Sequence, residues 1–194
     1  MELGIAVPVG STGHLGHYRG GEGVPRSSAL REESSALWRL LATHAGHHFT
    51  ALYEGAERWR ELYVGDLGPD VVGGDADLDI PFEDFLYGWR EGDQAGLSVA
   101  GHGVLRCLEC GAGLWLGKAY GAGPDEVSFF HAGAGAGGGR GNSANVPVNR
   151  ALWRFLAEHV MHELSVGVNG EAPAAVIGGT DGPSFEDYVA GWPG

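Results

Sequence analysis

The chain has 194 residues, 43% of them hydrophobic, so it is long enough to bury a core of its own. Its 25 acidic residues outnumber its 12 basic residues and give a formal charge of −13, which argues against nucleic-acid binding, since that binding depends on lysine and arginine displacing counterions. No stretch reaches the length of a membrane-spanning helix, and the N-terminus lacks the pattern of a signal peptide. The sequence therefore predicts a cytoplasmic protein that does not enter a membrane.

Two stretches of the chain resemble each other closely. Residues 36–49 read ALWRLLATHAGHHF and residues 151–164 read ALWRFLAEHVMHEL, with eight of fourteen positions identical. A second pair follows in the same order, FEDFLYGW at 82–89 and FEDYVAGW at 185–192. Self-similarity that recurs in the same order indicates that one unit has been repeated along the chain.

This repetition predicts a tandem duplication. The first module covers residues 1–95 and carries an acidic insertion at 69–80. The second covers 96–194 and carries a glycine-rich loop at 132–141, which we expect to be mobile because it has no side chains to bury. If the modules are copies, a pseudo-twofold axis is expected to relate them.

Each module is expected to contain the same elements in the same order. A β-hairpin, near residues 10–20 or 111–121, precedes the helix with the repeated Trp-Arg pair. A second hairpin follows the helix, and in the second module it turns at Asn169-Gly170, a pair typical of hairpins between apolar runs. Each FED segment then forms a short helix. The predicted fold class is α+β, a tandem duplication of a ββ-α-ββ-α module with mainly antiparallel strands.

The helix of each module has an apolar face that ends in histidines. His44 and His159 extend this face, and His47 and His162 lie near its edge, so we expect these rings to point toward the sheet. A buried, hydrogen-bonded histidine near a helix C-terminus explains the pattern without any ligand. The tryptophan of each Trp-Arg pair lies beside the apolar stripe and is expected to pack at the junction between the modules.

The second module also contains Cys107-Leu-Glu-Cys110-Gly111 ahead of an apolar run. This five-residue segment resembles the knuckle of zinc-ribbon and rubredoxin-type sites, in which two thiolates bind one metal across a tight turn. Zinc takes four ligands, and His159 and His162, at positions i and i+3 of the following helix, are the expected suppliers of the other two. The sequence thus predicts a structural zinc site formed by Cys107, Cys110, His159 and His162.

Other interpretations of these residues remain open. The cysteines can be a redox pair, although such a pair usually opens a helix, or they can be two buried thiols without a ligand. In the first module His14, His17 and His44, together with His47 or His48, can form an all-histidine site of the catalytic type. The alternative is that His14 and His17 belong to an exposed turn.

These patterns favour a non-catalytic acidic binding protein of the adaptor or toxin-neutralising type. Its partner would be a protein with a basic surface, and its second module would hold a structural metal. The first alternative is a metal-dependent enzyme that uses inward-facing histidines between the modules. In that enzyme His14, His17 and His44 would be site residues, and Glu158 or Glu163 would be the general base. The second alternative is a small-molecule binder that uses the cleft between the modules.

Overall fold

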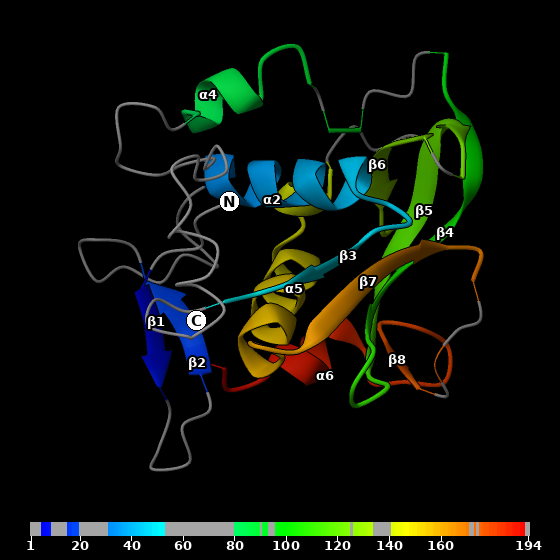
Figure 1. The fold of residues 1–194 in the computed structure, drawn as a ribbon. Helices are drawn as coiled ribbons and strands as arrows, with labels where there is room; N and C mark the ends of the chain where they lie inside the picture. The colour runs from blue at the N-terminus through cyan, green and yellow to red at the C-terminus, as the bar shows by residue number, and fades with distance from the viewer. Residues whose placement is uncertain are drawn as a thin grey trace.

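The structure, a computed structural model, has a mixed α+β fold, with four helices and a mostly antiparallel sheet in its described part (Figure 1). It describes residues 5–8, 15–19, 31–52, 80–89, 91–92, 96–124, 126–133, 141–170, 173 and 175–192, with the backbone alone for 5–8, 15–19 and 31. The α+β class expected from the sequence is confirmed. None of the described helices combines the length and apolar character needed to cross a membrane.

The main sheet has six strands in the order β3-β7-β4-β5-β6, with β8 beside β5. Neighbouring strands on this path run antiparallel, whereas β8 runs parallel to β5. A separate two-stranded sheet is formed by β1 (Ile5–Pro8) and β2 (Leu15–Arg19), which are antiparallel. The strands of the main sheet are β3 (His48–Thr50), β4 (Ser98–Cys107), β5 (Gly113–Gly123), β6 (Glu126–His131), β7 (Glu163–Val168) and β8 (Val176–Ile177).

Two long helices and two short ones accompany these strands. The long ones are α2 (Arg31–Thr43) and α5 (Val146–Glu158), which follows the 3-10 turn η2 (Asn142–Ala144). The short ones are α4 (Phe82–Phe85) and α6 (Phe185–Val189), which confirm the helices expected at the two FED segments. Ser184 caps α6, because its Oγ accepts a hydrogen bond from the Asp187 backbone N–H at 3.1 Å.

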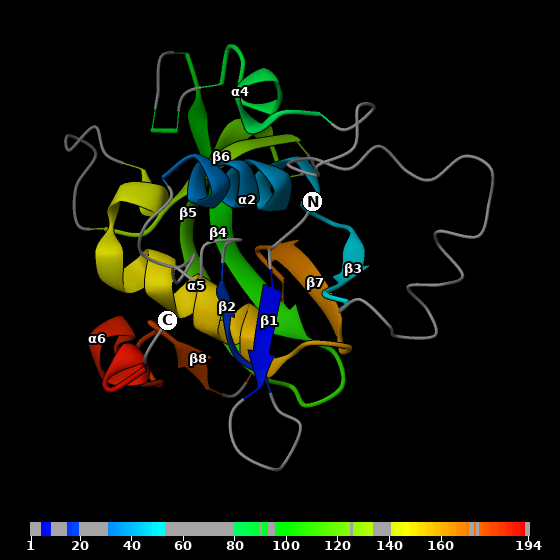
Figure 2. The same ribbon diagram turned by 90° about the vertical axis from the view of Figure 1, so that its left-hand side faces the viewer.

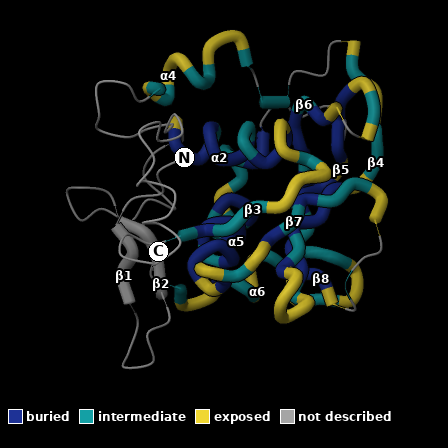
Figure 3. Tube along the Cα trace, viewed as in Figure 1, coloured by how far each residue is buried: buried dark blue, intermediate teal, exposed yellow. Residues whose placement is uncertain are grey.

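The core lies between the long helices and the main sheet. Helix α2 contacts β6, α5 contacts β5, and β2 and α6 both contact α5 (Figure 2). Buried residues concentrate in α2, α5 and the strands that face them (Figure 3). Trp38 and Trp153 are each only 1% exposed, which confirms that both tryptophans are buried.

The two long helices make reciprocal polar contacts inside this core. Trp38 Nε1 donates to Asn149 Oδ1 at 3.2 Å, and Trp153 Nε1 donates to Ser34 Oγ at 3.2 Å. Asn149 Nδ2 closes the network by donating to Ser34 Oγ at 3.0 Å. In the ungapped alignment of the two repeats Ser34 of α2 corresponds to Asn149 of α5. The tryptophan of each helix therefore donates to this same aligned position on the other helix.

The strands that follow the two helices pair with each other around aligned positions. Phe49 of β3 lies opposite Leu164 of β7, and these two residues correspond in the alignment. The flanking pairs of this register are His48 with Ser165 and Thr50 with Glu163. An antiparallel register centred on corresponding residues is the arrangement that a local twofold axis produces.

The turn between helix and strand is also alike in the two repeats. Gly46 and Met161 occupy corresponding positions, and both have a left-handed backbone, with φ of 86° and 69°. The Gly46 N–H donates to Val166 O, and the Met161 N–H donates to Ala51 O, both at 2.8 Å. Glycine adopts this conformation without cost, whereas methionine does so against a steric penalty.

The expected hairpin at Asn169-Gly170 is wrong. Asn169 does have a left-handed backbone, with φ of 55°, but β8 pairs with β5 and not with β7. The Asn169 side chain instead bridges the backbone of β4, accepting from His102 N and donating to Ala100 O, each at 3.0 Å. Asn169 therefore lies at the end of β7 and ties that end to β4 through these hydrogen bonds.

Three predictions concern segments outside the described residues. They are the second hairpin of the first module beyond residue 52, all but the last residue of the acidic insertion at 69–80, and most of the glycine-rich loop at 132–141. The ββ-α-ββ-α module and its pseudo-twofold axis therefore remain a prediction for the chain as a whole.

Candidate metal centre

Three of the four residues expected to bind zinc lie together at one edge of the main sheet. Cys107 is the last residue of β4 and is fully buried, Cys110 lies in the exposed turn that follows, and His162 immediately precedes β7. One ligand atom from each lies within 4.8 Å of the others. In the part of the chain that the structure describes, this is the one group of three such residues close enough to share an ion.

The turn between the cysteines directs backbone N–H groups at the sulfur of Cys107. The Cys110 N–H points at Cys107 Sγ, with a nitrogen–sulfur distance of 3.5 Å, and Gly111, with φ of 74°, lets the chain reverse. Burial raises the pKa of the Cys107 thiol, while hydrogen bonds from the Cys110 and Glu109 backbone N–H groups act in the opposite direction. A cation bound at the sulfur would stabilise the thiolate and offset the cost of burying its negative charge.

His162 is oriented to bind through Nδ1. This atom lies 3.3 Å from Cys107 Sγ, close to the separation of about 3.5 Å between a sulfur and a nitrogen that share a tetrahedral zinc ion. The other ring nitrogen, Nε2, lies 3.8 Å from Glu109 Oε2, and Glu109 Oε1 accepts from the Glu163 N–H at 2.9 Å. A carboxylate on the far nitrogen is the usual way to fix the orientation of a metal-binding histidine.

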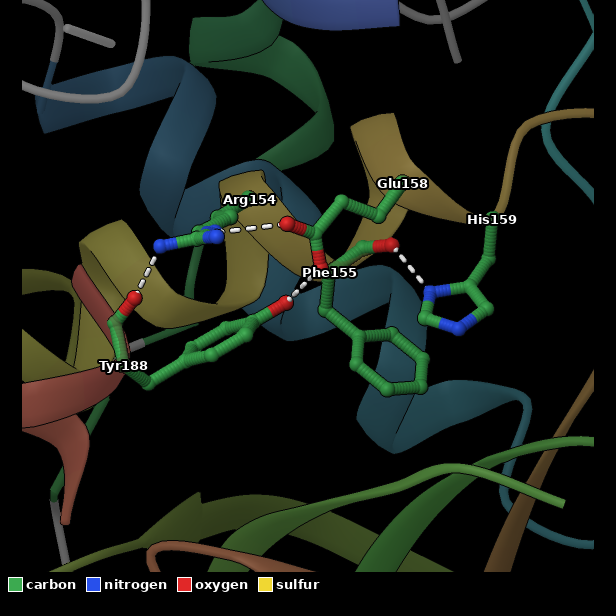
Figure 4. A network of polar contacts seen from close by, with 5 residues as sticks. All are labelled: Arg154, Phe155, Glu158, His159 and Tyr188. Carbon is green, nitrogen blue, oxygen red and sulfur yellow. Dashed lines mark hydrogen bonds and ion pairs between the residues drawn. The ribbon is translucent and has the colours of Figure 1, made fainter. Parts of the chain in front are cut away.

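His159, the fourth expected ligand, does not join this group. Its Nδ1 is bonded to Phe155 O at 2.7 Å, and its ring stacks on Phe155 at 4.1 Å (Figure 4). Burial lowers the pKa of His159, which favours the neutral form of the ring. The reason for the separation is that α5 ends at Glu158, and the i, i+3 spacing of His159 and His162 does not fall on a helix. His159 is a buried histidine satisfied by its own helix.

Glu158, considered as a general base, is engaged in a local network (Figure 4). Its carboxylate accepts from Arg154 Nε at 2.7 Å and from the Tyr188 hydroxyl at 2.6 Å. The Arg154 guanidinium lies 4.5 Å from the centre of the Tyr188 ring and also donates to Tyr188 O. Burial, reinforced by the bond to Glu158, raises the pKa of Tyr188. These contacts attach α6 to α5.

The histidines of the first module are not gathered into a site by the described residues. His14 lies outside them, and His17 lies in β2 with its side chain undescribed. His44 and His47 are both exposed, so the expectation that His44 points into the core is wrong. Helix α2 ends one residue earlier, and His44 Nδ1 bonds back to Leu40 O at 2.8 Å.

Glu163, the other candidate base, is exposed and faces His48, with its Oε1 2.9 Å from His48 Nδ1. Its backbone N–H holds Glu109, which the sequence analysis did not single out. The signal for Glu109 was its place between two cysteines, where its side chain can lie close to an ion that they bind.

Comparison with protein families, with curated proteins and with solved structures finds no match. The chemistry of the site is therefore inferred from its geometry.

Proposed function

We propose that this chain is an acidic binding protein made of two copies of one module, with a structural zinc ion that cross-links two segments of the second copy. The observation that carries the proposal is the convergence of Cys107, Cys110 and His162 within 4.8 Å. Two thiolates and an imidazole form a ligand set that suits zinc.

The zinc ion would join two segments that are far apart in the sequence. Cys107 and Cys110 belong to the turn between β4 and β5, and His162 belongs to the link between α5 and β7. The antiparallel pairing of β4 with β7, which sets Cys107 opposite Leu164, already supports this junction, together with hydrogen bonds such as the one from the Leu108 N–H to Glu163 O at 2.9 Å. Because the ion binds the folded chain and not the unfolded one, its binding free energy adds to stability.

Thermal unfolding with and without zinc tests the metal site. At free zinc 100 times above its dissociation constant, we expect about 2.7 kcal/mol of added stability, a rise in Tm of roughly 5–10 °C for a chain of this size. Cys110→Ser removes one ligand at an exposed position, so it should abolish the zinc effect and leave the metal-free Tm unchanged. His47→Ala, at the position that corresponds to His162, should keep the zinc effect. A zinc effect that survives both Cys110→Ser and His162→Ala would refute this site.

The matching contacts of the two repeats support the duplication. They include the reciprocal bonds of Trp38 and Trp153, the register centred on Phe49 and Leu164, and the similar turns that follow the helices. Arginines at corresponding positions also stack on the aromatic ring of the following FED helix, at 4.9 Å in the first repeat and 4.5 Å in the second. Two unrelated segments have no physical reason to share this set of contacts.

The binding function rests on charge. The chain carries a formal charge of −13, and the acidic side chains of both FED helices, Glu83, Asp84, Glu186 and Asp187, are exposed. A field of this sign steers positively charged proteins and repels nucleic acid. The partner is therefore proposed to be a protein with a basic surface.

Binding to an array of lysine- and arginine-rich peptides tests this part of the proposal. We expect saturable binding that weakens steeply as salt rises, because exposed charges are screened within about 10 Å at 0.1 M salt. Replacing the acidic residues at 70, 75, 77 and 79 by asparagine should lower the affinity, with Glu126→Gln as a single-charge control. Affinity that is independent of both salt and these substitutions would contradict a function based on charge.

A metal-dependent enzyme is the second candidate, and one observation favours it. The described residues supply three ligands where zinc takes four, and an open position is the property that distinguishes catalytic from structural zinc sites. Glu163, the general base expected from the sequence, donates its backbone N–H to Glu109, and Glu109 is the carboxylate that lies 3.8 Å from His162 Nε2. Zinc-dependent turnover of an activated ester that is lost in Cys110→Ser would favour this candidate.

A further inference from the structure

We propose that the fourth ligand of the zinc ion is a neutral imidazole supplied by a histidine of the protein partner. This inference rests on the proposed metal site and names what completes it. Three features of the site lead to it: its exposure, its charge and the apolar residues beside two of its ligands.

The ion would lie at the surface of the protein. Cys110 is exposed, and the His162 side chain is 36% exposed, so a ligand from outside can reach a metal held by both. In the described part of the chain no other histidine, cysteine, aspartate or glutamate offers an atom within 4.8 Å of all three ligands. As far as the described residues go, the fourth position of a tetrahedral ion is thus open to an external donor or to water.

The charge of the site selects a neutral donor. Two thiolates cancel the charge of a divalent ion, and a neutral histidine adds none. The Glu109 carboxylate lies against the His162 ring, and the chain as a whole carries many more acidic than basic groups. An anionic fourth ligand would be repelled by these groups, whereas an imidazole would not.

Apolar side chains adjoin the ligands in the sequence. Leu108 follows Cys107 and is 42% exposed, and Met161 precedes His162 and is 39% exposed. Met161 occupies a left-handed backbone conformation, with φ of 69°, where the first repeat has Gly46. A side chain that is kept in a strained conformation without being fully buried indicates a use outside the core. Leu108 and Met161, which we call the apolar rim, offer a surface for the carbon atoms of an incoming ring.

Cobalt substitution of the full-length protein tests the inference, because tetrahedral Co²⁺ reports its ligands through visible absorption bands. We expect Co²⁺ to show thiolate charge-transfer bands, and its visible bands to change on titration with imidazole but not with acetate. N-benzylimidazole should bind about fivefold more tightly than imidazole, because its apolar ring adds buried area on the rim. Leu108→Ser and Met161→Gly should each reduce that preference. A peptide with histidine between lysines should bind more tightly than one with histidine between glutamates.

The outcomes separate the two proposals. If no thiolate band appears, the metal site itself fails. If the band appears and imidazole has no effect, the fourth position is already filled and the inference is wrong. A response to imidazole that appears only in His159→Ala would show that the chain supplies the fourth ligand itself. An equal response to acetate would refute the argument from charge.

Discussion

Exchanging the buried side chains of Ser34 in α2 and Asn149 in α5 should preserve the free energy of unfolding, although each of the two single substitutions should lower it. In Asn149→Ser, Trp38 loses the acceptor that lies 3.2 Å from its Nε1, and Ser34 loses the donor at 3.0 Å. One lost hydrogen bond and one unsatisfied buried N–H cost about 2–4 kcal/mol. Ser34→Asn places a larger side chain in a filled core, which costs about 1–3 kcal/mol. The double variant restores one asparagine and one serine, with the partners of the two tryptophans exchanged.

We expect the double variant to lie within about 1 kcal/mol of the wild type, although the two single losses sum to about 3–7 kcal/mol, so the interaction energy between the two positions should be at least about 2 kcal/mol. Urea unfolding of the wild type, the two single variants and the double variant measures this quantity, provided that the m-values agree. If the double variant loses the sum of the two single effects, the sites are not equivalent, and the pseudo-twofold relation of the two helices is wrong.

Other substitutions test the remaining parts of the account. Met161→Gly should raise the metal-free stability by about 0.5–1 kcal/mol, because relief of the left-handed backbone outweighs the added chain entropy, while Gly46→Ala should lower it by about 1 kcal/mol. Tyr188→Phe should cost about 1–2 kcal/mol at pH 7, measured by urea unfolding. The raised pKa of Tyr188 means that the folded protein keeps a proton that the unfolded chain releases near pH 10, so wild-type stability should fall above that pH, and Tyr188→Phe should lessen the fall. Shortening the glycine-rich loop between Gly133 and Gly141, without the buried Ala132, should leave thermal stability nearly unchanged.

Periodic and local features of the fold could be predicted from the sequence. The apolar stripes predict the long helices, and the FED segments predict the short ones, because each of these patterns is set by residues that are close together in the sequence. The C-x-x-C-G segment likewise contains its own turn, with Gly111 in the left-handed conformation that the turn requires. Features of this kind need no knowledge of the rest of the chain.

Strand partners and helix ends could not be predicted in this way. Asn169 has the backbone conformation expected of a hairpin residue, but β8 pairs with β5, a choice that depends on packing far along the chain. The sequence pattern predicts one helical face for His159 and His162, whereas α5 ends before both of them. The strand β6 was missed, since it has no counterpart among the repeated segments. In each case the outcome depends on tertiary contacts and not on local pattern.

X-ray absorption at the zinc K edge tests the central claim most directly. Purified protein equilibrated with zinc should hold one ion per chain, with two sulfur ligands at about 2.3 Å and two nitrogen or oxygen ligands at about 2.0–2.1 Å. Cys110→Ser should lose one of the two sulfur ligands. A zinc ion with no sulfur ligand, or a protein that binds no zinc at all, would contradict a metal centre formed by Cys107, Cys110 and His162.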